Sequence, residues 1–303
     1  MNKRVLITGA SGFLGRACLP YLLERGFEIH AVASREENFL AASEVSWHVC
    51  DLLDGEQTQK LTAQLRPEFL LHTAWCPAVP GEFWNDPSNP IWVRASLQLL
   101  EAFAAAGGTR VAMVGTCAEY DWSEGICHEA NTPLVGRATY GECKLALFLA
   151  SRSLAKSLDV SLAWGRIFFL YGPHEHPRRL VSSITRALLQ DQTASCSSGE
   201  QQRDFLHIED AASALVATLD SQVQGAVNIA SGQAVAIKTM AVQLAKLIGK
   251  SELLALGALP SSAGEPPLLI GDAGRLREEV LWVPRYDLHS GLQATIEWWK
   301  DNL

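Results

Sequence analysis

The chain has 303 residues, of which 48% are hydrophobic and 19% charged. This composition is typical of a soluble globular protein, and the length allows one large α/β unit or two fused lobes. No apolar run reaches the ~18–20 residues that a membrane-spanning helix needs, so no membrane partner is expected. The formal net charge of −8 argues against a nucleic-acid partner, which requires a basic face.

The cysteines and the amino terminus indicate a reducing compartment. The seven cysteines are scattered, odd in number and without a C-x-x-C pair. This usage favours reduced thiols over a disulfide framework or a zinc site, and no metal is expected. A strand is predicted almost at once, from Arg4, which argues against a cleavable signal peptide. We therefore expect a cytoplasmic protein.

Short apolar, β-branched runs alternate with helical periodicity in the first part of the chain. Strands are predicted at residues 4–8, 28–33, 47–50, 69–73, 110–115 and 160–167. Helices are predicted between several of them, at residues 13–25, 91–106 and 139–158. Apolar strands that alternate with helices indicate a doubly wound parallel sheet covered on both faces. We assign residues 1–171 to this α/β domain.

The pattern loosens after residue 171. Helices are predicted at residues 180–190, 209–221, 237–248 and 288–300, separated by connections rich in Gly, Ser and Pro. We interpret residues 172–303 as mainly a smaller C-terminal α/β lobe packed against the sheet. Part of it, near residues 205–230, is expected to return to the sheet through a strand around residues 226–229.

A glycine-rich turn follows the first predicted strand. The strand runs directly into Gly9-x-x-Gly12-x-x-Gly15, and a helical pattern follows. The first glycine allows a tight turn, the second lets a pyrophosphate approach the backbone, and the third allows close helix–strand packing. Dinucleotide phosphates then bind unpaired N–H groups at the helix N-terminus. The motif predicts a Rossmann-type NAD(P) site whose turn residues are Gly9, Ser11, Gly12, Phe13, Leu14 and Gly15.

The end of the second predicted strand bears on the choice of dinucleotide. NAD-preferring sites usually place an acidic residue there for the ribose hydroxyls. Here Ser34 can donate a hydrogen bond to a 2′-phosphate, and Arg35 can pair with its charge, assisted by Arg16. We therefore favour NADP. The alternative is NAD, with Glu36 or Glu37 on the ribose.

Tyr140 and Lys144 open a predicted helix and lie four residues apart, so their side chains share one face. A free phenol, with a pKa of about 10, is a poor acid–base at neutral pH. A nearby cation favours the phenolate and is expected to lower that pKa. Thr116, at the end of an adjacent predicted strand, is the candidate for orienting a substrate oxygen.

These motifs and the segment Arg203-Asp-Phe-Leu-His-Ile-Glu-Asp210 occur in the order seen in extended short-chain dehydrogenases/reductases. The whole chain resembles a nucleotide-sugar epimerase, dehydratase or reductase. The resemblance implies that Tyr140 is the acid–base, that Lys144 holds the nicotinamide ribose and that Thr116 binds the substrate oxygen. It also implies that Arg203 grips a substrate diphosphate. Further cofactor contacts are expected from Asp51 and Leu52 at the adenine, and from Thr73, Ala74 and Ile167.

The residues after Thr116 bear on the reaction. The 4,6-dehydratases of the family place an acid and a base directly after this threonine, where this chain has Cys117 and Ala118. Glu119 comes one position late, and one position along a strand points to the opposite face. Dehydration is therefore disfavoured.

Reduction and epimerisation remain. An epimerase keeps its cofactor, usually NAD, whereas a reductase exchanges it, which suits NADPH. We therefore expect a reductase of a nucleotide-linked 4-keto-sugar, with a 4-epimerase that retains NAD as the alternative and a non-catalytic dinucleotide sensor as a third class.

The substrate side differs from many UDP-sugar relatives. Phe169 replaces an asparagine that helps to hold the substrate in them, and His174 is a candidate substrate contact. Four tryptophans fall in segments expected to line the cleft, where sugar stacking and ordinary packing are both open: Trp75, Trp84, Trp92 and Trp122. Apolar positions at residues 97–103 and 145–154 permit a homodimer, although core packing also explains them.

Overall fold

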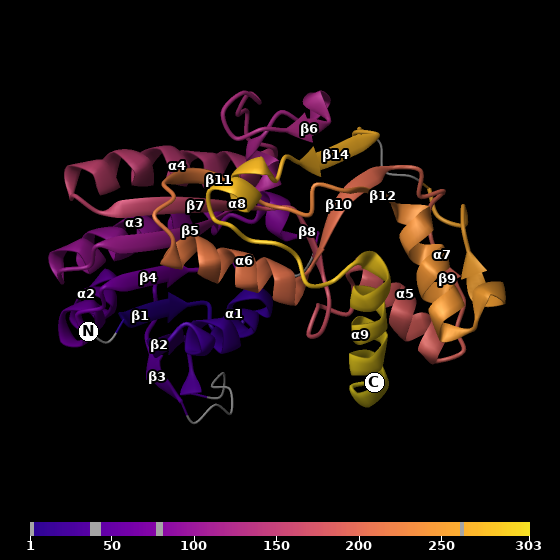
Figure 1. Cartoon of the computed structure of the whole chain (residues 1–303), viewed down its shortest axis with the longest axis horizontal. Coiled ribbons are helices and arrows are strands. Elements are labelled where there is room, and N and C mark those ends of the chain that lie inside the picture. The colour runs from indigo at the N-terminus through magenta and orange to yellow at the C-terminus, as the bar shows by residue number, and fades with distance from the viewer. Residues whose placement is uncertain (1–2, 37–43, 77–80, 261–263) are drawn as a thin grey trace.

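The computed structural model describes residues 3–36, 44–76, 81–260 and 264–303, and its centre is a seven-stranded parallel sheet (Figure 1). The strand order is β11-β7-β5-β4-β1-β2-β3. These strands are β1 (Lys3–Thr8), β2 (Phe27–Ala33), β3 (Val45–Val49), β4 (Phe69–His72), β5 (Arg110–Thr116), β7 (Ser161–Ile167) and β11 (Gly225–Ile229). All six neighbouring pairs are parallel. The predicted Rossmann-type α/β fold is therefore confirmed.

Helices cover both faces of this sheet. On one face lie α1 (Phe13–Glu24) and α6 (Ile208–Asp220); on the other lie α2 (Gly55–Leu65), α3 (Asn89–Ala105) and α4 (Ala138–Ser157). Alternate residues of β1 belong to separate cores, because Val5 and Ile7 pack with α1 and α6 whereas Leu6 packs with α3 and α4. Burial on both faces explains the unbroken apolar run that predicted this strand.

Helix α2 was not expected from the sequence. Its residues are mostly polar, and its buried face consists of Thr58, Thr62 and Leu65. Because two of these three are threonines, the segment lacks the apolar periodicity on which helix prediction depends. The available signal was Asp54, whose side chain caps the helix by accepting hydrogen bonds from the N–H groups of Glu56 and Gln57.

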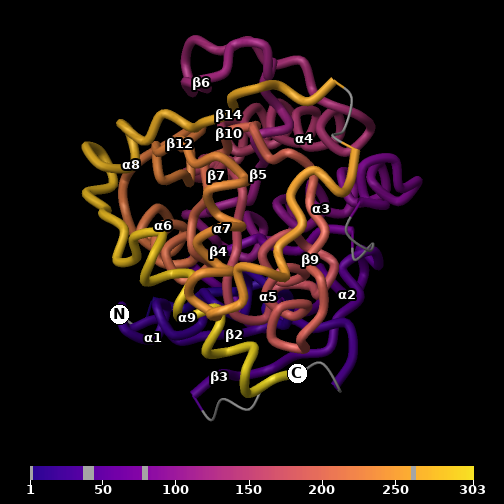
Figure 2. Tube along the Cα trace, turned by 90° about the vertical axis from the view of Figure 1, so that its right-hand side faces the viewer, coloured from indigo at the N-terminus to yellow at the C-terminus, as the bar shows by residue number. Residues whose placement is uncertain are grey.

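The C-terminal part of the chain forms a second lobe beside the carboxyl ends of the main strands (Figures 1 and 2). Its core lies among α5 (Leu180–Leu189), α7 (Ile237–Ile248) and α9 (Leu288–Asp301). A second sheet has the order β12 (Ala234–Ala236), β10 (Gln202–His207), β14 (Leu268–Gly271) and β6 (Ile126–Cys127), with β8 (Phe169–Tyr171) also paired to β10. The remaining strands and α-helix are the β9 (Ala194–Ser195) and β13 (Leu254–Ala255) pair and α8 (Gly274–Glu278).

Two crossings join the lobes. Strand β11 returns to the main sheet and pairs with β7, where Val227 lies opposite Gly165. In the other direction, β6 leaves the first half of the chain and pairs with β14, where Cys127 lies opposite Gly271. Helix α6, between β10 and β11, packs on α1. The predicted boundary at residue 171 follows β8, which already pairs with β10 of the second sheet, so the division into two domains stays a prediction.

The seven cysteines are unpaired thiols. Within the described part of the chain, no helix is long and apolar enough to cross a membrane.

The close packing at Gly15 predicts that a larger residue at this position destabilises the protein. A Cβ atom at position 15 would meet the Gly9 carbonyl oxygen and lie 2.8 Å from the Thr73 Oγ1 atom. We expect Gly15→Ala to lower the free energy of unfolding by about 1–3 kcal/mol through overpacking. Gly55→Ala is the matched control, because its Cβ would meet only the flexible Gln98 side chain at 3.4 Å. Equal urea midpoints for the two variants would contradict the close approach at Gly15.

Candidate active site

The turn between β1 and α1 is built around two tight backbone approaches. Gly9 has φ +68°, and a Cβ there would lie 2.7 Å from the Ala74 nitrogen and 2.8 Å from Thr73 Oγ1. Gly15 brings the first turn of α1 against the Gly9 carbonyl oxygen. The Thr73 hydroxyl donates to the Thr8 carbonyl oxygen at 2.7 Å and locks this corner. Glycine is therefore required at both positions.

The N-terminus of α1 is open in the way that a dinucleotide phosphate needs. Its N-cap is the exposed Gly12, no side chain caps it, and no acidic residue lies in its first turn. Ser11, Phe13 and Leu14 are half-buried around it. Free N–H groups and the positive end of the helix dipole favour an anion here. The residues present therefore fit the phosphates of NAD(P).

The other expected cofactor residues follow neighbouring strands of the same sheet. Ser34 and Arg35 are exposed after β2, as is Glu36, whereas Glu37 lies outside the described residues. The remaining positions are Asp51 and Leu52 after β3, Thr73 and Ala74 after β4, and Ile167 at the end of β7. Carboxyl ends of parallel strands meet at one edge, so the topology brings these positions to the rim that carries the glycine turn.

Tyr140 lies in the first turn of α4, enclosed by aromatic rings. The ring centroids of Phe83, Trp84 and Trp75 lie 4.9, 5.7 and 6.4 Å from its own, each in an edge-to-face arrangement. Burial raises the pKa of the Tyr140 phenol well above its ordinary value, while the Thr116 hydroxyl and, more weakly, Arg179 lower it. The direction is opposite to the one expected from a neighbouring cation, because desolvation outweighs every charge nearby.

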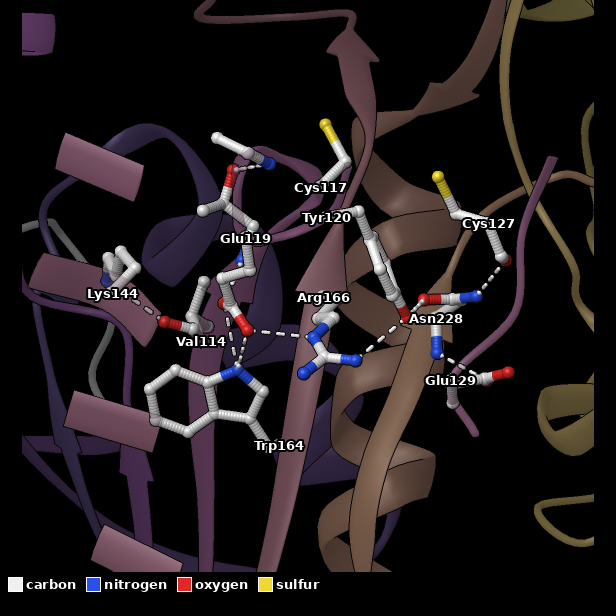
Figure 3. Close-up of polar contacts among 12 residues, drawn as sticks. Val114, Cys117, Glu119, Tyr120, Cys127, Glu129, Lys144, Trp164, Arg166 and Asn228 are labelled. Carbon is white, nitrogen blue, oxygen red and sulfur yellow. Dashed lines mark hydrogen bonds and ion pairs between the residues drawn. The ribbon is translucent and has the colours of Figure 1, made fainter. Parts of the chain in front are cut away.

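Lys144 is 3% exposed on the same face of α4. Its ammonium donates to the Val114 carbonyl oxygen at 2.9 Å (Figure 3). It also lies 3.7 Å from the ring centroid of Trp75. Desolvation lowers the pKa of Lys144 to about 7, although the charge of Glu119 opposes the shift. Desolvation also lowers the pKa of the buried His72 to about 3, with a further contribution from the charge of Lys144.

The aromatic enclosure is organised by a residue that the sequence did not indicate. Asn89, at the start of α3, is fully buried and accepts a hydrogen bond from Trp75 Nε1 at 2.8 Å. Its amide donates to the carbonyl oxygens of Phe83 and Asp86 at 2.8 and 3.0 Å. One asparagine thus holds both Trp75 and the segment that carries Trp84. No local motif marks such a contact, because the partners come from separate segments.

Two of the other tryptophans also belong to this cluster. The Trp92 ring lies 6.3 Å from Trp75, and the Trp122 ring lies 6.2 Å from Trp84. Trp122 is covered on one face by Arg137, whose guanidinium carbon is 4.6 Å from the ring centroid. The cluster therefore extends from the buried Lys144 towards the surface at Trp122.

The structure corrects the expected orientation of Glu119. Strand β5 ends at Thr116, and Cys117–Glu119 form the 3₁₀ turn η3, so strand alternation does not apply. The Thr116 hydroxyl accepts from the Ala118 N–H at 3.2 Å. The Glu119 carboxylate turns back beneath the strand, fully buried, and pairs with Arg166 at 2.7 Å. Glu119 is thus engaged elsewhere, which disfavours dehydration for a different reason from the predicted one.

A cleft of about 780 Å³ opens next to the tryptophan cluster. It lies between the 3₁₀ turn η4 (Trp122–Glu124), the start of α4 and residues 264–268. Tyr140 is not among the described residues that line it, and Trp122 is the link between the two. The Tyr140 cluster holds the hydroxyl, the phenol and the amine that the sequence predicts as catalytic groups, and these roles stay predictions.

Arg203 lies directly behind one wall of this cleft. Its guanidinium donates to the Glu265 carboxylate and to the Pro266 carbonyl oxygen, each at 2.9 Å, and both partners line the cleft. The guanidinium carbon also lies 5.7 Å from the centroid of the Phe169 ring. The structure therefore brings together Arg203 and Phe169, two of the positions expected on the substrate side.

His174 is placed elsewhere. It is exposed, has φ +67° and shares a 3.0 Å hydrogen bond with Arg16. Its ring centroid lies 4.6 Å from that of Trp298, with the two rings tilted by 59°. These contacts put it beside the glycine turn and α9, away from Arg203, so its role as a substrate contact stays a prediction. Among the residues that the structure describes, no group of three or more metal-ligating side chains is placed to hold a metal ion.

Comparisons with known proteins agree with this geometry. The profile of the NAD dependent epimerase/dehydratase family matches residues 5–230. The dTDP-6-deoxy-L-talose 4-dehydrogenase (NAD(+)) of Aggregatibacter actinomycetemcomitans is 28% identical over 78% of this chain and 87% of its own length. The GDP-6-deoxy-D-mannose reductase of Pseudomonas aeruginosa is 24% identical, with 100% of this chain and 99% of the relative covered.

Among solved structures, the UDP-glucose 4-epimerase of Thermus thermophilus in complex with NAD superposes with a TM-score of 0.86. That comparison covers 99% of this chain and 100% of the other at 22% identity, which supports the fold. The family match spans the glycine turn, the strand that ends at Thr116 and the helix of Tyr140 and Lys144. The chain therefore belongs to the NAD dependent epimerase/dehydratase family, within the extended short-chain dehydrogenases/reductases.

Proposed function

We propose that this protein reduces a nucleotide-linked 4-keto-sugar with a hydride from NAD(P)H, with Tyr140 as the proton donor. The observation that carries the proposal is the enclosed Tyr140 phenol, whose pKa is raised by burial, beside the Thr116 hydroxyl. A phenol carries its proton at neutral pH even with its ordinary pKa of about 10, and burial strengthens this preference. The protonated phenol is the form that reduction consumes. Epimerisation begins with oxidation of a hydroxyl and needs the phenolate instead.

The proposed roles follow from this arrangement. When bound, the reduced nicotinamide supplies the hydride. Tyr140 donates its proton to the C4 oxygen, which is more basic as an alkoxide than a phenolate is. The Thr116 hydroxyl orients that oxygen. One N–H of the Lys144 ammonium binds the Val114 carbonyl oxygen, and another holds the nicotinamide ribose. Arg203 would reach a substrate diphosphate after exchanging its partner Glu265.

The relatives support a nucleotide-sugar substrate. Two of them are named for reactions at sugars linked to a nucleoside diphosphate, a 4-dehydrogenase and a reductase. Solved structures of similar fold contain UDP-glucose or UDP-glucuronic acid. For the cofactor we propose a preference for NADP, on the exposed Ser34 and Arg35 after β2. NAD is the alternative, because the neighbouring structures hold it.

A second candidate is a nucleotide-sugar 4-epimerase that retains NAD. It is favoured by the solved structures of similar fold, several of which are named 4-epimerases. Such an enzyme would need the Tyr140 phenolate, which the positive charge of a bound oxidised nicotinamide would favour and burial disfavours.

We further propose a cytoplasmic protein and a division into a cofactor domain over residues 1–171 and a mainly substrate-binding lobe over 172–303. A homodimer through α3 and α4 is also proposed, although Leu99, Phe103 and Leu147 are core residues. Among the described residues, Leu149 on α4 and Ile91 on α3, which are 44% and 41% exposed, remain accessible to a partner.

The first prediction from the proposed function concerns Tyr140. With a panel of nucleotide-linked 4-keto-sugars, the wild type should consume NADPH, and Tyr140→Phe should lower kcat by about 10²–10⁴-fold. Cofactor affinity should stay the same. Tyr21→Phe, on α1, is the matched control. Wild-type turnover by Tyr140→Phe would contradict the mechanism. Tightly bound NAD with epimer formation and no NADPH consumption would favour the second candidate.

The second prediction concerns Arg35. If it pairs with a 2′-phosphate, Arg35→Ala should weaken NADPH binding by about tenfold or more, or ~1.4 kcal/mol, and leave NADH binding unchanged. Arg25→Ala removes another surface arginine, paired with Asp220 across α1 and α6, and should change neither affinity. Equal losses for NADH and NADPH, measured by calorimetry, would favour NAD as the natural cofactor.

The third prediction concerns the charge of Lys144. The folded protein releases this proton near pH 7, whereas the ordinary lysine value is 10.5. The unfolded chain therefore binds the extra proton between these values, and stability rises with pH through that window. Relative to Lys144→Met, the wild type should gain on the order of 1–2 kcal/mol between pH 7 and pH 9. Urea unfolding at both values checks this, with the exposed Lys238→Met as control, and a constant difference would refute it.

A further inference from the structure

An ion pair between Glu119 and Arg166 is completely enclosed where β5 meets α4. Both side chains are 0% exposed, and the guanidinium Nε lies 2.7 Å from the carboxylate Oε2 (Figure 3). Removing two charges from water is costly, and an apolar pair of similar volume is often as stable. A contribution to folding stability alone is therefore a weak explanation for this ion pair. The other hydrogen bonds that Glu119 and Arg166 make provide a better one.

The Glu119 side chain holds the backbone of Thr116. The Thr116 N–H donates to Oε1 at 2.9 Å, and the Trp164 indole N–H donates to the same oxygen at 3.0 Å. A Cβ at position 115 would meet the Trp164 nitrogen and lie 2.5 Å from this carboxylate, so Gly115 leaves the space. The carboxylate thus fixes the last residue of β5, the one that presents the hydroxyl.

The main chain of the same turn fixes the start of α4. The Glu119 carbonyl oxygen accepts from the N–H groups of Val135 and Gly136 at 3.0 and 3.1 Å. The Ala118 carbonyl oxygen accepts from Arg137, the N-cap of α4, at 2.8 Å. Tyr140 follows in the first turn of that helix. The turn η3 therefore sets the distance between the backbones that carry the hydroxyl and the phenol.

Arg166 is itself anchored from the far side. Its Nη1 donates to the Tyr120 hydroxyl at 2.9 Å, and that hydroxyl donates to Asn228 Oδ1 at 2.7 Å (Figure 3). Asn228 donates to the Cys127 carbonyl oxygen at 2.9 Å, so the network runs from β7 through β11 to β6. Each of these side chains is fully buried. The carboxylate is thus held in one position by groups that have no freedom to move.

We propose that Glu119 is a positioning residue: its carboxylate holds the Thr116 backbone in register with Tyr140, and Arg166 is the counter-ion that allows this acceptor to be buried. The inference rests on the proposed roles of Thr116 and Tyr140 in hydride transfer. Glu119 itself exchanges no proton with substrate, because Thr116, Trp164 and Arg166 occupy its oxygens.

Two charge-neutral double variants separate positioning from folding. Both replace Arg166 by Met, which removes the buried cation. Glu119→Gln with Arg166→Met keeps an oxygen that can accept from the Thr116 N–H. Glu119→Leu with Arg166→Met has nearly the same volume but no acceptor. The pair therefore differs in the side-chain amide beneath Thr116, whose oxygen is the acceptor for the Thr116 N–H, and the wild type is the reference for both.

We expect the Gln variant to retain kcat within about threefold of the wild type, and the Leu variant to lose at least tenfold. KM and the dissociation constant for NADPH should agree within twofold between the two. Hydrogen exchange of the Thr116 amide should be at least tenfold faster in the Leu variant, because only there does it lack a partner. Equal kcat, or equal amide protection, in two folded variants would overturn the inference.

Failure of the proposed function gives a different result from failure of the positioning role of Glu119. If the wild type reduces no 4-keto-sugar, kcat is compared on the epimerase reaction, and the amide exchange needs no substrate at all. If the Leu variant alone fails to fold, Glu119→Ala with Arg166→Met replaces it, since alanine also lacks the acceptor. Wild-type Thr116 protection in that variant counts against the inference.

Discussion

The buried carboxylate of Glu119 lies at the point where the strand of Thr116, the helix of Tyr140 and the second lobe meet. Its side chain accepts from β5 and β7, and its backbone accepts from the residues that lead into α4. Through Arg166 and Tyr120 the same contacts continue to Asn228 on β11. The side-chain partners Thr116, Trp164 and Arg166 are buried, so their hydrogen bonds to Glu119 are shielded from competition with water.

Water exclusion governs the chemistry of the site as well as its shape. The same desolvation raises the pKa of the Tyr140 phenol and lowers the pKa of Lys144 to about 7. Both groups are thereby driven towards their neutral forms, since each charged form loses its hydration. A bound cofactor or substrate that brings a charge into this space acts against little competing solvent. Charge at the site is therefore set mainly by what binds there.

The parts of the fold with regular local patterns were predictable. Unbroken apolar runs such as the one through Val5 and Ile7 marked strands, and the spacing of Gly9 to Gly15 marked the phosphate turn. The polar buried face of α2 left no such pattern. At the site, Tyr140, Lys144 and Thr116 were recognisable, whereas Asn89 was not, because its partners lie in distant segments. The predicted orientation of Glu119 was wrong, because it assumed that strand geometry continues past Thr116, where the chain instead turns into η3.

The pairing of β6 with β14 also bears on how the chain reaches this structure. Ile126 lies opposite Ile270, so this pairing closes a loop that contains β7, β10 and β11. Contacts between such distant positions slow folding, because loop closure must precede the gain from burial. Neither half of the chain contains a complete set of strands for its own lobe. The two lobes should therefore acquire their final form in one cooperative step, late in folding, and a chain released before β14 would leave β6 without its partner.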